Sequence, residues 1–288
     1  MTRTGFHTAM PEKLTSSVVF ASPHSGRDYS WAFMRRSALS ELAIRSSEDA
    51  FVDQLIDGAP LLGCPLLTAT VPRAFVDMNR SDDELDPALI DGVKKSSHNP
   101  RVASGLGVIP RVVANGRAIY RGKLSLDEAR SRLQHYWHPY HSELRRLLQN
   151  AHMHFGQAIL ADFHSMPHEA LDSISRRGQP RPDVVIGDRF GASASSDIVQ
   201  QVEAAFTKAG FNVARNTPFA GAYVTQTYGR PSRNQHAIQI ELDRSLYMAE
   251  RKLAKSARFG RVRSALSGVI ADIADLGRPK QALPMAAE

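Results

Sequence analysis

The sequence is poor in cysteine and has no long apolar run. Only one of its 288 residues is a cysteine, Cys64, which excludes an internal disulfide framework and a cysteine-rich zinc site. No stretch approaches the roughly 20 apolar residues of a membrane-spanning helix. The start, MTRTGFHTAMPEKLTSS, has no apolar run long enough for a signal peptide. We therefore expect a cytoplasmic protein without membrane contact.

Negative charge is also in short supply, because 36 Lys and Arg residues outnumber 29 Asp and Glu residues and give a net charge of +7. Such a surplus suits nucleic acid or anionic small molecules as partners. Part of it lies in ERKLAKSARFGRVR (250–263), which is typical of the solvated face of a C-terminal helix. No nucleic-acid-binding motif accompanies this segment. A small anionic substrate is therefore the expected partner, and a non-catalytic basic binding protein is the less favoured alternative.

Short apolar runs alternate with amphipathic segments along the chain, and this alternation is typical of an α/β fold with a mostly parallel mixed sheet and helices on both faces. We expect one domain over residues 1–288, with a loosely packed or disordered N-terminus (about 1–15) and C-terminal tail (about 278–288). A polar excursion over 81–117 is expected to contain a hairpin turn at Asn115-Gly116. The predicted strands are 17–24, 65–71, 157–163, 183–188, 211–215, 222–228 and 236–242. The predicted helices are 37–45, 49–63, 126–151 with a kink at Pro139, 195–209, and one at the C-terminus.

Three of these strands carry residues that suit chemistry better than packing. His24 follows a strand in SPHSGR, His164 ends one in ADFHSMP, and Glu241 lies within AIQIELDRSLY. Ligands of α/β sheets gather at the carboxyl ends of the strands. Catalytic zinc takes three His or carboxylate ligands and keeps a position for water. His24 and His164 supply two ligands, Glu48 or Asp49 supplies the third, and Glu241 is placed to take the proton of the water.

A further cluster follows the second predicted strand. The segment VPRAFVDMNR contains Arg73, Asp77, Asn79 and Arg80. The guanidinium group of arginine matches a carboxylate with two parallel hydrogen bonds. This segment therefore predicts a site for anionic oxygen.

Six motifs occur in an order that resembles the N-formylglutamate amidohydrolase (N-formylglutamate deformylase) family. They are SPHSGR, SEDAFVDQL, PRAFVDMNR, YWHPYH, ADFHS and HAIQIELDRSLYM, and they run from about residue 17 to 250. The resemblance implies a phosphorylase/hydrolase-like α/β core related to zinc carboxypeptidases and aspartoacylase. It also implies that His24 and His164 are zinc ligands and that Glu241 is the general base.

The resemblance implies further roles around the substrate. Arg73 would polarise the scissile carbonyl, and Asn79 and Arg80 would hold the α-carboxylate. His141, in YWHPYH, would border the pocket. The related carboxypeptidases place a Glu ligand three residues after the first His, where this chain has Arg27.

The third ligand must therefore come from further along the chain. Asp49 is favoured over Glu48, because the acidic position of the family before the VD segment aligns with Asp49. The expected activity is zinc-dependent hydrolysis of N-formyl-L-glutamate, or a similar small N-acyl amino acid, to formate and glutamate, late in histidine breakdown. We expect one Zn²⁺ per chain, with another divalent transition metal as the alternative. A carboxypeptidase-like peptidase, or an acylase for another N-acyl amino acid, is the alternative activity, and the sequence is silent on oligomeric state.

Overall fold

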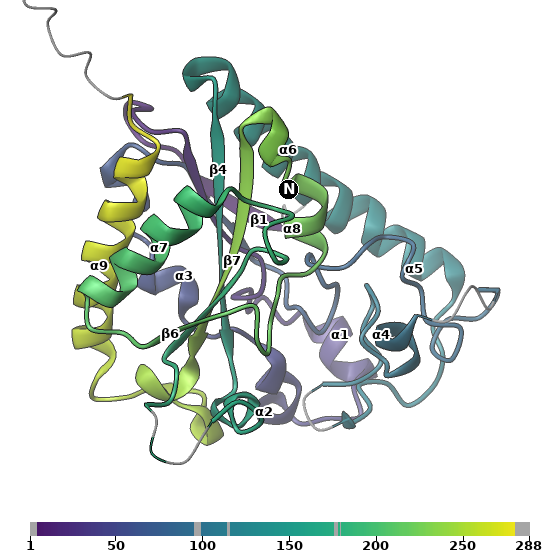
Figure 1. The fold of residues 1–288 in the computed structure, drawn as a ribbon. Coiled ribbons are helices and arrows are strands. Elements are labelled where there is room, and N and C mark those ends of the chain that lie inside the picture. The colour runs from purple at the N-terminus through teal and green to yellow at the C-terminus, as the bar shows by residue number, and fades with distance from the viewer. Residues whose placement is uncertain (1–4, 95–98, 114–115, 176–177, 179, 280–288) are drawn as a thin grey trace, which may run out of the picture.

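A seven-stranded sheet in the order β1-β3-β2-β4-β7-β5-β6 runs through the centre of the protein (Figure 1). The computed structural model describes residues 5–94, 99–113, 116–175, 178 and 180–279. The strands of the sheet are β1 (Phe6–Ala9), β2 (Val18–Ser22), β3 (Leu66–Ala69), β4 (Ala158–Met166), β5 (Val184–Gly187), β6 (Val213–Arg215) and β7 (Gln235–Asp243). A separate two-stranded sheet pairs β8 (Met248–Ala249) with β9 (Ala254–Lys255).

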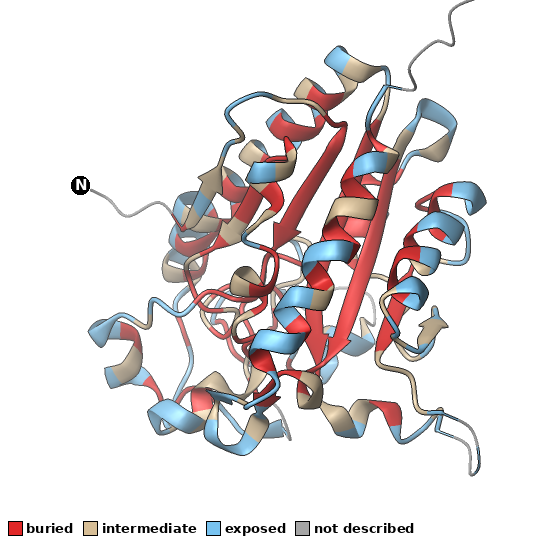
Figure 2. Ribbon diagram, turned by 90° about the vertical axis from the view of Figure 1, so that its left-hand side faces the viewer, coloured by how far each residue is buried: buried red, intermediate tan, exposed pale blue. Residues whose placement is uncertain are grey.

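Neighbouring strands of the large sheet are mostly parallel. The pairs β2–β3, β2–β4, β4–β7 and β5–β6 are parallel, whereas β1–β3 and β5–β7 are antiparallel. The predicted mostly parallel, mixed α/β sheet is confirmed. Its central strands β2 and β4 are buried along their whole length (Figure 2), as strands covered on both faces must be.

Helices cover both faces of the sheet (Figure 1). One face packs against α3 (Val52–Leu55), α7 (Ser196–Lys208) and α9 (Phe259–Leu276). The other packs mainly against α6 (His138–Phe155) and α8 (Tyr223–Tyr228). The remaining helices are α1 (Trp31–Arg36), α2 (Glu41–Ile44), α4 (Pro100–Ala103) and α5 (Leu126–Arg132). Within the described residues, no helix combines the length and the apolar character that crossing a bilayer requires.

The alternation of side chains along β4 determines where polar groups can gather. Ile159, Ala161 and Phe163 face the core that contains α7 and α9. Leu160 lies on the opposite face of the sheet, which packs against α6. Asp162 and His164 follow it on that face. The α6 face of the sheet is therefore apolar at the amino ends of the strands and polar at their carboxyl ends.

The long helix predicted over 126–151 is divided before Pro139. A π-helical segment, Leu133–Trp137, separates α5 from α6. Pro139 has no amide hydrogen for a helical bond, and such positions commonly carry a distortion of the helix. The distortion has a use, because the indole Nε1 of Trp137 donates to the carbonyl of Arg80 at 2.9 Å.

Three expectations differ from the structure. The helix predicted over 49–63 consists only of the short α3 and a 3₁₀ turn, Ala59–Leu62. The N-terminus was expected to be loose over about 1–15, but β1 is the antiparallel partner of β3, with Phe6 opposite Ala69. Residues 222–228 were expected to be a strand because Val, Thr and Tyr favour strands, but they form α8. Tertiary contacts favour the helix, because side-chain oxygens of Gln239 and Asn79 accept from the N–H groups of Ala222 and Val224. Asn115 of the expected hairpin turn and residues 280–288 of the expected tail lie outside the described residues.

Candidate metal centre

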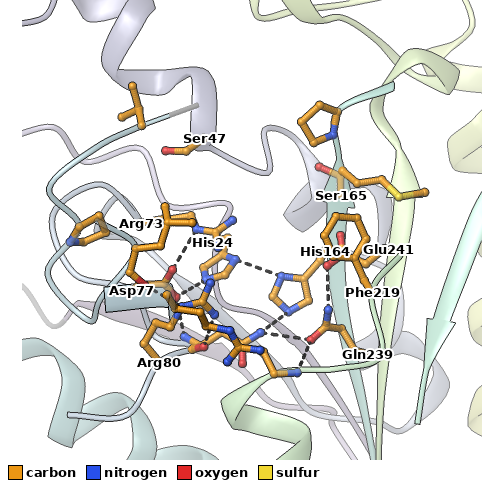
Figure 3. A pocket seen from close by; sticks show the side chains of 18 of the residues that line it. His24, Ser47, Arg73, Asp77, Arg80, His164, Ser165, Phe219, Gln239 and Glu241 are labelled. Atoms are coloured by element: carbon orange, nitrogen blue, oxygen red, sulfur yellow. Dashed lines mark hydrogen bonds and ion pairs between the residues drawn. The ribbon is translucent and has the colours of Figure 1, made fainter. Parts of the chain in front are cut away.

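A cavity of about 660 Å³ opens at the carboxyl ends of β2, β4 and β7 (Figure 3). His24, which follows β2, lines it together with His164 of β4 and Glu241 of β7. The segment after β3, with Arg73 and Arg80, forms another part of its wall. The strand ends thus bring together His24, His164 and Glu241, three of the residues that the sequence singled out, and the volume is that of a small-molecule site.

Three ligand-type atoms converge at this edge of the sheet. The Nδ1 atoms of His24 and His164 lie 3.1 Å apart. Asp49 Oδ2 lies 3.4 Å from His24 Nδ1 and 3.2 Å from His164 Nδ1. Zinc bonds of about 2.0–2.1 Å at tetrahedral angles separate their ligand atoms by about 3.3 Å. The three atoms therefore have the spacing of three ligands of one tetrahedral zinc ion, and all three residues are buried.

The other nitrogen of each ring faces a carboxylate. His24 Nε2 lies 2.7 Å from Asp77 Oδ1, and His164 Nε2 lies 3.0 Å from Asp162 Oδ2. In the neutral form of each ring, the nitrogen with the closer carboxylate oxygen, Nε2, carries the proton, so both Nδ1 atoms keep a lone pair. Carboxylates commonly orient metal-binding histidines in this way. Two lone pairs and a carboxylate oxygen pointing at one another need a cation between them, so these residues fit a divalent metal.

The structure separates the two acidic residues that competed for the third position. Glu48 is buried but accepts from Arg45 Nε at 2.9 Å and from the hydroxyl of Tyr29 at 3.4 Å. Asp49 turns the other way, where Arg244 Nη2 donates to Asp49 Oδ1 at 2.9 Å. This hydrogen bond leaves Asp49 Oδ2 toward the histidines. The structure brings Asp49, and not Glu48, to the two rings.

The backbone around His24 is fixed by a close approach of two strand ends. A Cβ atom on Gly26 would lie 2.0 Å from the carbonyl oxygen of Val71, so only glycine fits there. The amide of Asp49 donates to the carbonyl of His24 at 3.0 Å. The second contact joins the motifs SPHSGR and SEDAF at the site, and the first holds the loop after β2 against the end of β3.

Buried carboxylates determine how the ring of His164 titrates. Burial disfavours an imidazolium at His164, but Asp162 and Asp49 outweigh it and raise the pKa of His164 well above its ordinary value. Burial likewise disfavours a charged Asp49, yet His164 and His24 hold the pKa of its carboxyl well below the ordinary range. Without a metal ion, the centre therefore favours a proton on His164, where a bound cation would otherwise supply the positive charge.

Glu241 lies beside the three ligand-type residues. It is the register partner of His164 on the adjacent strand and is 8% exposed. Burial raises the pKa of Glu241 to about 7, with Asp49 adding to the shift and His164 and Arg73 opposing it. Gln239 Nε2 donates to Glu241 Oε1 at 2.8 Å. A carboxyl with a pKa near neutrality is suited to exchange protons.

Arg73 and Arg80 differ in how their guanidinium groups are held. Arg73 Nε donates to Asp77 Oδ2 at 3.0 Å, and its other nitrogens have no protein partner within hydrogen-bond distance in the described part of the chain. Arg80 is 8% exposed and donates to the carbonyls of Leu106 and Asn79 at 3.0 and 2.8 Å. Burial lowers the pKa of Arg80, and repulsion from Arg73 adds to the effect.

A further arginine, absent from the sequence predictions, belongs to the same wall. Arg101 of α4 lines the cavity and is exposed. Its positive charge adds to the lowering of the pKa of Arg80, after burial and Arg73. Neither Arg80 nor Arg101 has a carboxylate within ion-pair distance among the residues that the structure describes. The other two cavity arginines, Arg73 and Arg244, are paired with Asp77 and Asp49.

The amide of Asn79 is occupied within the protein. Asn79 Oδ1 accepts from the amide of Val224 at 2.9 Å, and Asn79 Nδ2 donates to Gln239 Oε1 at 3.3 Å. The same Nδ2 lies 3.4 Å from His164 Nε2. Asn79 does line the cavity, but these contacts leave its amide little freedom to bind a substrate carboxylate.

The expectation that His141 borders the pocket is not met in the described residues, because the cavity wall does not include it. His141 is buried, with Nε2 2.9 Å from the carbonyl of Met78 and Nδ1 2.9 Å from the hydroxyl of Tyr228. Burial lowers the pKa of His141 to about 3, so the ring is neutral. It supports the backbone beneath the loop that carries Asn79 and Arg80.

Sequence reasoning gave no role to Asp162, Gln239 or Arg244. Asp162 precedes His164 by two residues on a strand, and Gln239 has the same relation to Glu241, so both share a face with a predicted site residue. This two-residue spacing is the sequence feature that could have identified Asp162 and Gln239. Arg244 reaches Asp49 across 195 positions of sequence, which no local pattern reveals.

Comparison with known proteins agrees with the resemblance. A family model described as N-formylglutamate amidohydrolase matches residues 16–248. N-formylglutamate deformylase of Pseudomonas putida is 30% identical over 240 residues, which cover 81% of this chain and 82% of that protein. The enzyme of the same name from Pseudomonas aeruginosa is 28% identical over 236 residues, again covering 81% and 82%.

Two solved structures are similar over nearly the whole chain. The crystal structure of N-formylglutamate amidohydrolase from Ralstonia eutropha JMP134 has a TM-score of 0.89 and 32% identity, and covers 96% of this chain and 99% of that one. A gene product from Agrobacterium tumefaciens has a TM-score of 0.63 and 15% identity, and covers 94% and 96%. The second structure shows the likeness of fold alone.

Proposed function

Because the chain belongs to the N-formylglutamate amidohydrolase family, we propose that it hydrolyses the amide of N-formyl-L-glutamate to formate and glutamate. The observation that carries the proposal is the convergence of His24, Asp49 and His164 beside the buried carboxyl of Glu241. The relatives and the solved structure bear the names of this activity. The proposal applies that activity to the residues of this chain.

We propose Zn²⁺ as the cation of the centre, bound by His24 Nδ1, Asp49 Oδ2 and His164 Nδ1. Two nitrogens and one oxygen suit zinc, and a catalytic site of this kind keeps one position open. When bound there, zinc would polarise the formyl carbonyl and lower the pKa of water toward 7. Asp77 and Asp162 orient the two rings and make them better ligands.

Glu241 is proposed as the general base. Its carboxyl takes the proton of the attacking water and later gives it to the leaving amine. Its position opposite His164 places it beside the metal ligands, and its raised pKa suits both directions of transfer. The apolar flanks Ile240 and Leu242 pack in the core and keep the strand in place.

Arg73 is proposed to stabilise the negative charge that develops on the formyl oxygen. Asp77 holds one edge of its guanidinium group through Nε, so the group is oriented before substrate arrives. Preorganised charge of this kind is commonly the largest single contribution to catalysis. Asp77 therefore serves both Arg73 and His24 and ties the two together.

Arg80 and Arg101, which have no carboxylate partner in the described part of the chain, suit the two carboxylates of N-formylglutamate. Arg80 is held by two backbone carbonyls in a fixed orientation, and we propose that it binds the α-carboxylate. Arg101 is the other arginine of the wall that has no carboxylate partner among the described residues, and we propose that it binds the side-chain carboxylate. A charge-assisted contact to each favours a dianion over a neutral amino-acid side chain.

We also propose a cytoplasmic location. The one cysteine, Cys64, is buried and free, as is usual for proteins of reducing compartments.

Steady-state hydrolysis of a small panel tests the proposed activity. N-formyl-L-glutamate, N-acetyl-L-aspartate and a short peptide are compared with metal-loaded wild-type protein and with Glu241→Gln. We expect N-formyl-L-glutamate to have the highest kcat/KM, and Glu241→Gln to lower kcat by about 10²–10⁴-fold. Preference for the peptide or the acetyl compound would instead identify a peptidase or another acylase.

A further inference from the structure

We propose that Gln239 and Asn79 are positioning residues, which fix the carboxylate of Glu241 through a chain of side-chain amides anchored on the backbone of α8. The inference rests on the proposed role of Glu241 as the base. It gives Asn79 a part in the reaction other than binding the substrate carboxylate, and it gives Gln239 a part that the sequence did not suggest.

The chain of amides begins at two backbone N–H groups. The amide of Val224 donates to Asn79 Oδ1 at 2.9 Å, and Asn79 Nδ2 donates to Gln239 Oε1 at 3.3 Å. The amide of Ala222 donates to the same Gln239 Oε1 at 3.1 Å. Gln239 Nε2 then donates to Glu241 Oε1 at 2.8 Å (Figure 3). Each amide thus receives hydrogen bonds on its oxygen and donates from its nitrogen.

The direction of the chain cannot reverse. A backbone N–H only donates, so Ala222 requires an oxygen from Gln239 at that position, and Val224 requires one from Asn79. With both oxygens fixed, the NH₂ group of Gln239 must point at Glu241. A flipped Gln239 would put two donors together at Ala222 and two acceptors together at Glu241. Asn79 and Gln239 are only 2% and 4% exposed, so water is not available to repair such a mismatch.

This geometry differentiates the two oxygens of Glu241. Oε1 accepts the hydrogen bond from Gln239, and the described residues offer Glu241 no other hydrogen-bond partner. Oε2 is therefore the oxygen left for the cavity. We infer that the proton taken from water is held on Oε2, while Oε1 stays an acceptor throughout the reaction. Loss of Gln239 would free the carboxylate to rotate and would misalign Oε2.

The register of β4 and β7 supports this role for Gln239, because the two strands place corresponding side chains opposite each other. Gln239 lies opposite Asp162, and Glu241 lies opposite His164 on the adjacent strand. On β4 the distal Asp162 orients the ring of His164. On β7 the distal Gln239 orients the carboxylate of Glu241. β4 and β7 thus each carry one functional side chain and, two residues earlier, the side chain that orients it.

Kinetics of Gln239→Met and Gln239→Glu in two backgrounds test the proposal. In the wild-type background we expect kcat to fall about 10–100-fold, the usual loss of a hydrogen bond to a charged group, with KM changed less than about threefold and metal content unchanged. In the Glu241→Gln background the same substitution should change the residual kcat less than about twofold, because residues that act through one another are not additive. Gln235→Met is the control, since Gln235 lies on the same strand and donates to the carbonyl of Tyr228, away from the cavity.

Several outcomes overturn the inference. Equal loss of kcat in both backgrounds would show that Gln239 supports the fold or the substrate rather than Glu241. Unchanged kcat for both Gln239 variants, beside a strong Glu241→Gln effect, would overturn the inference and leave the proposed function standing. A Glu241→Gln protein with wild-type kcat would overturn the base role and this inference together. For Asn79→Ala we expect a fall in kcat that also disappears in the Glu241→Gln background. A rise confined to KM would instead show that Asn79 binds the substrate and would overturn its positioning role.

A spectroscopic measurement on metal-free protein tests the geometry without activity. The side-chain NH₂ resonances of Gln239 are identified by their loss in Gln239→Glu. We expect slow solvent exchange for the proton that faces Glu241, and a clear shift of its resonance in Glu241→Leu. Resonances that exchange freely and do not respond to Glu241→Leu would overturn the proposed contact.

Discussion

The rings of His24 and His164 face each other through Nδ1 atoms that lie 3.1 Å apart, while each Nε2 is held by its own carboxylate. The two neutral rings cannot satisfy one another in this arrangement, because each presents a lone pair. Either a proton or a metal ion must lie between them. The high pKa of His164 and the spacing of the ligand atoms are two consequences of one cause, a concentration of buried negative charge around the rings.

Metal content should distinguish the neighbouring acids Asp49 and Glu48. Asp49→Asn removes a charged ligand atom and should empty the centre, whereas Glu48→Gln, which touches Arg45 and Tyr29, should leave it full. Elemental analysis after dialysis against a weak chelator gives the stoichiometry, expected to be about one zinc per wild-type chain. A full centre in Asp49→Asn, or an empty one in Glu48→Gln, would show that the third ligand has been misassigned.

The carboxylate behind His164 should tune the affinity for metal. Asp162→Asn leaves the three ligands in place but weakens the orientation and basicity of the ring, so zinc affinity should fall about 10–100-fold. Because a bound metal stabilises the folded state by mass action, the variant should also unfold at a lower temperature than wild type at the same limiting free zinc. Competition with a chelating dye measures the affinity directly.

Asp243→Asn is the matched control for this substitution. Asp243 is also buried on a central strand and also contacts a histidine, with Oδ2 2.7 Å from His168 Nδ1. It stands apart from the three metal-ligand residues, so zinc affinity should not change. Equal losses for the two variants would mean that affinity follows general stability rather than the orientation of His164.

Glu241→Gln should stabilise the metal-free protein at alkaline pH. Burial raises the pKa of Glu241 from 4.5 to about 7, so the folded chain holds a proton here that the unfolded chain has released. Wild-type stability therefore falls as pH rises from 4.5 to about 7. Glutamine does not titrate, so at pH values above this window the variant should gain about 3 kcal/mol in free energy of unfolding, and the gain should vanish toward the acid end of the window.

Urea unfolding in the presence of a chelator measures this difference. Glu128→Gln provides a control of opposite sign, because Arg36 and Arg132 overcome burial and lower the pKa of Glu128. That variant should lose stability above the ordinary pKa of the carboxyl, and the loss should shrink as pH falls. A Glu241→Gln variant less stable than wild type at every pH would show that the carboxylate is well solvated or well paired in the metal-free state.

The sequence predicted the parts of the fold that buried runs define. β4 and β7 read as strands because apolar residues alternate or run together along them, and their polar ends pointed to His164 and Glu241. The choice between Glu48 and Asp49 could only be argued from a resemblance, since the contacts that separate them come from Arg45 on one side and Arg244, 195 positions away, on the other.

Residues 222–228 show why local propensity was insufficient. Their Val, Thr and Tyr residues favour a strand, but the N–H groups at the start of α8 are satisfied by Asn79 and Gln239. Both acceptors belong to distant segments that no local window contains. The same applies to Arg101, whose place in the cavity wall depends on how the excursion after β3 folds back over the strand ends.

Arg80 and Arg101 should recognise different carboxylates of the substrate. Arg80→Gln should reduce kcat/KM for N-formyl-L-glutamate about 10–100-fold, the loss expected for a charge-assisted hydrogen bond, and should abolish the preference over the α-amide. Arg101→Gln should keep that preference but abolish the preference for N-formyl-glutamate over N-formyl-glutamine. Both losses should appear mainly in KM, because these contacts exist in the ground state and the transition state alike. Steady-state kinetics of both variants on the three compounds measure the pattern.

Arg121→Gln removes the same charge from an exposed position outside the cavity wall and controls for the overall field. It should leave all three kcat/KM values close to those of wild type, since exposed charges beyond about 10 Å are screened at ordinary salt. If Arg80→Gln and Arg101→Gln lowered kcat/KM for all three compounds by one common factor, the two arginines would attract anions without recognising either carboxylate. A crossed pattern, in which each variant loses one preference and retains the other, requires two separate contacts, because a shared electrostatic field cannot distinguish the α-amide from the side-chain amide.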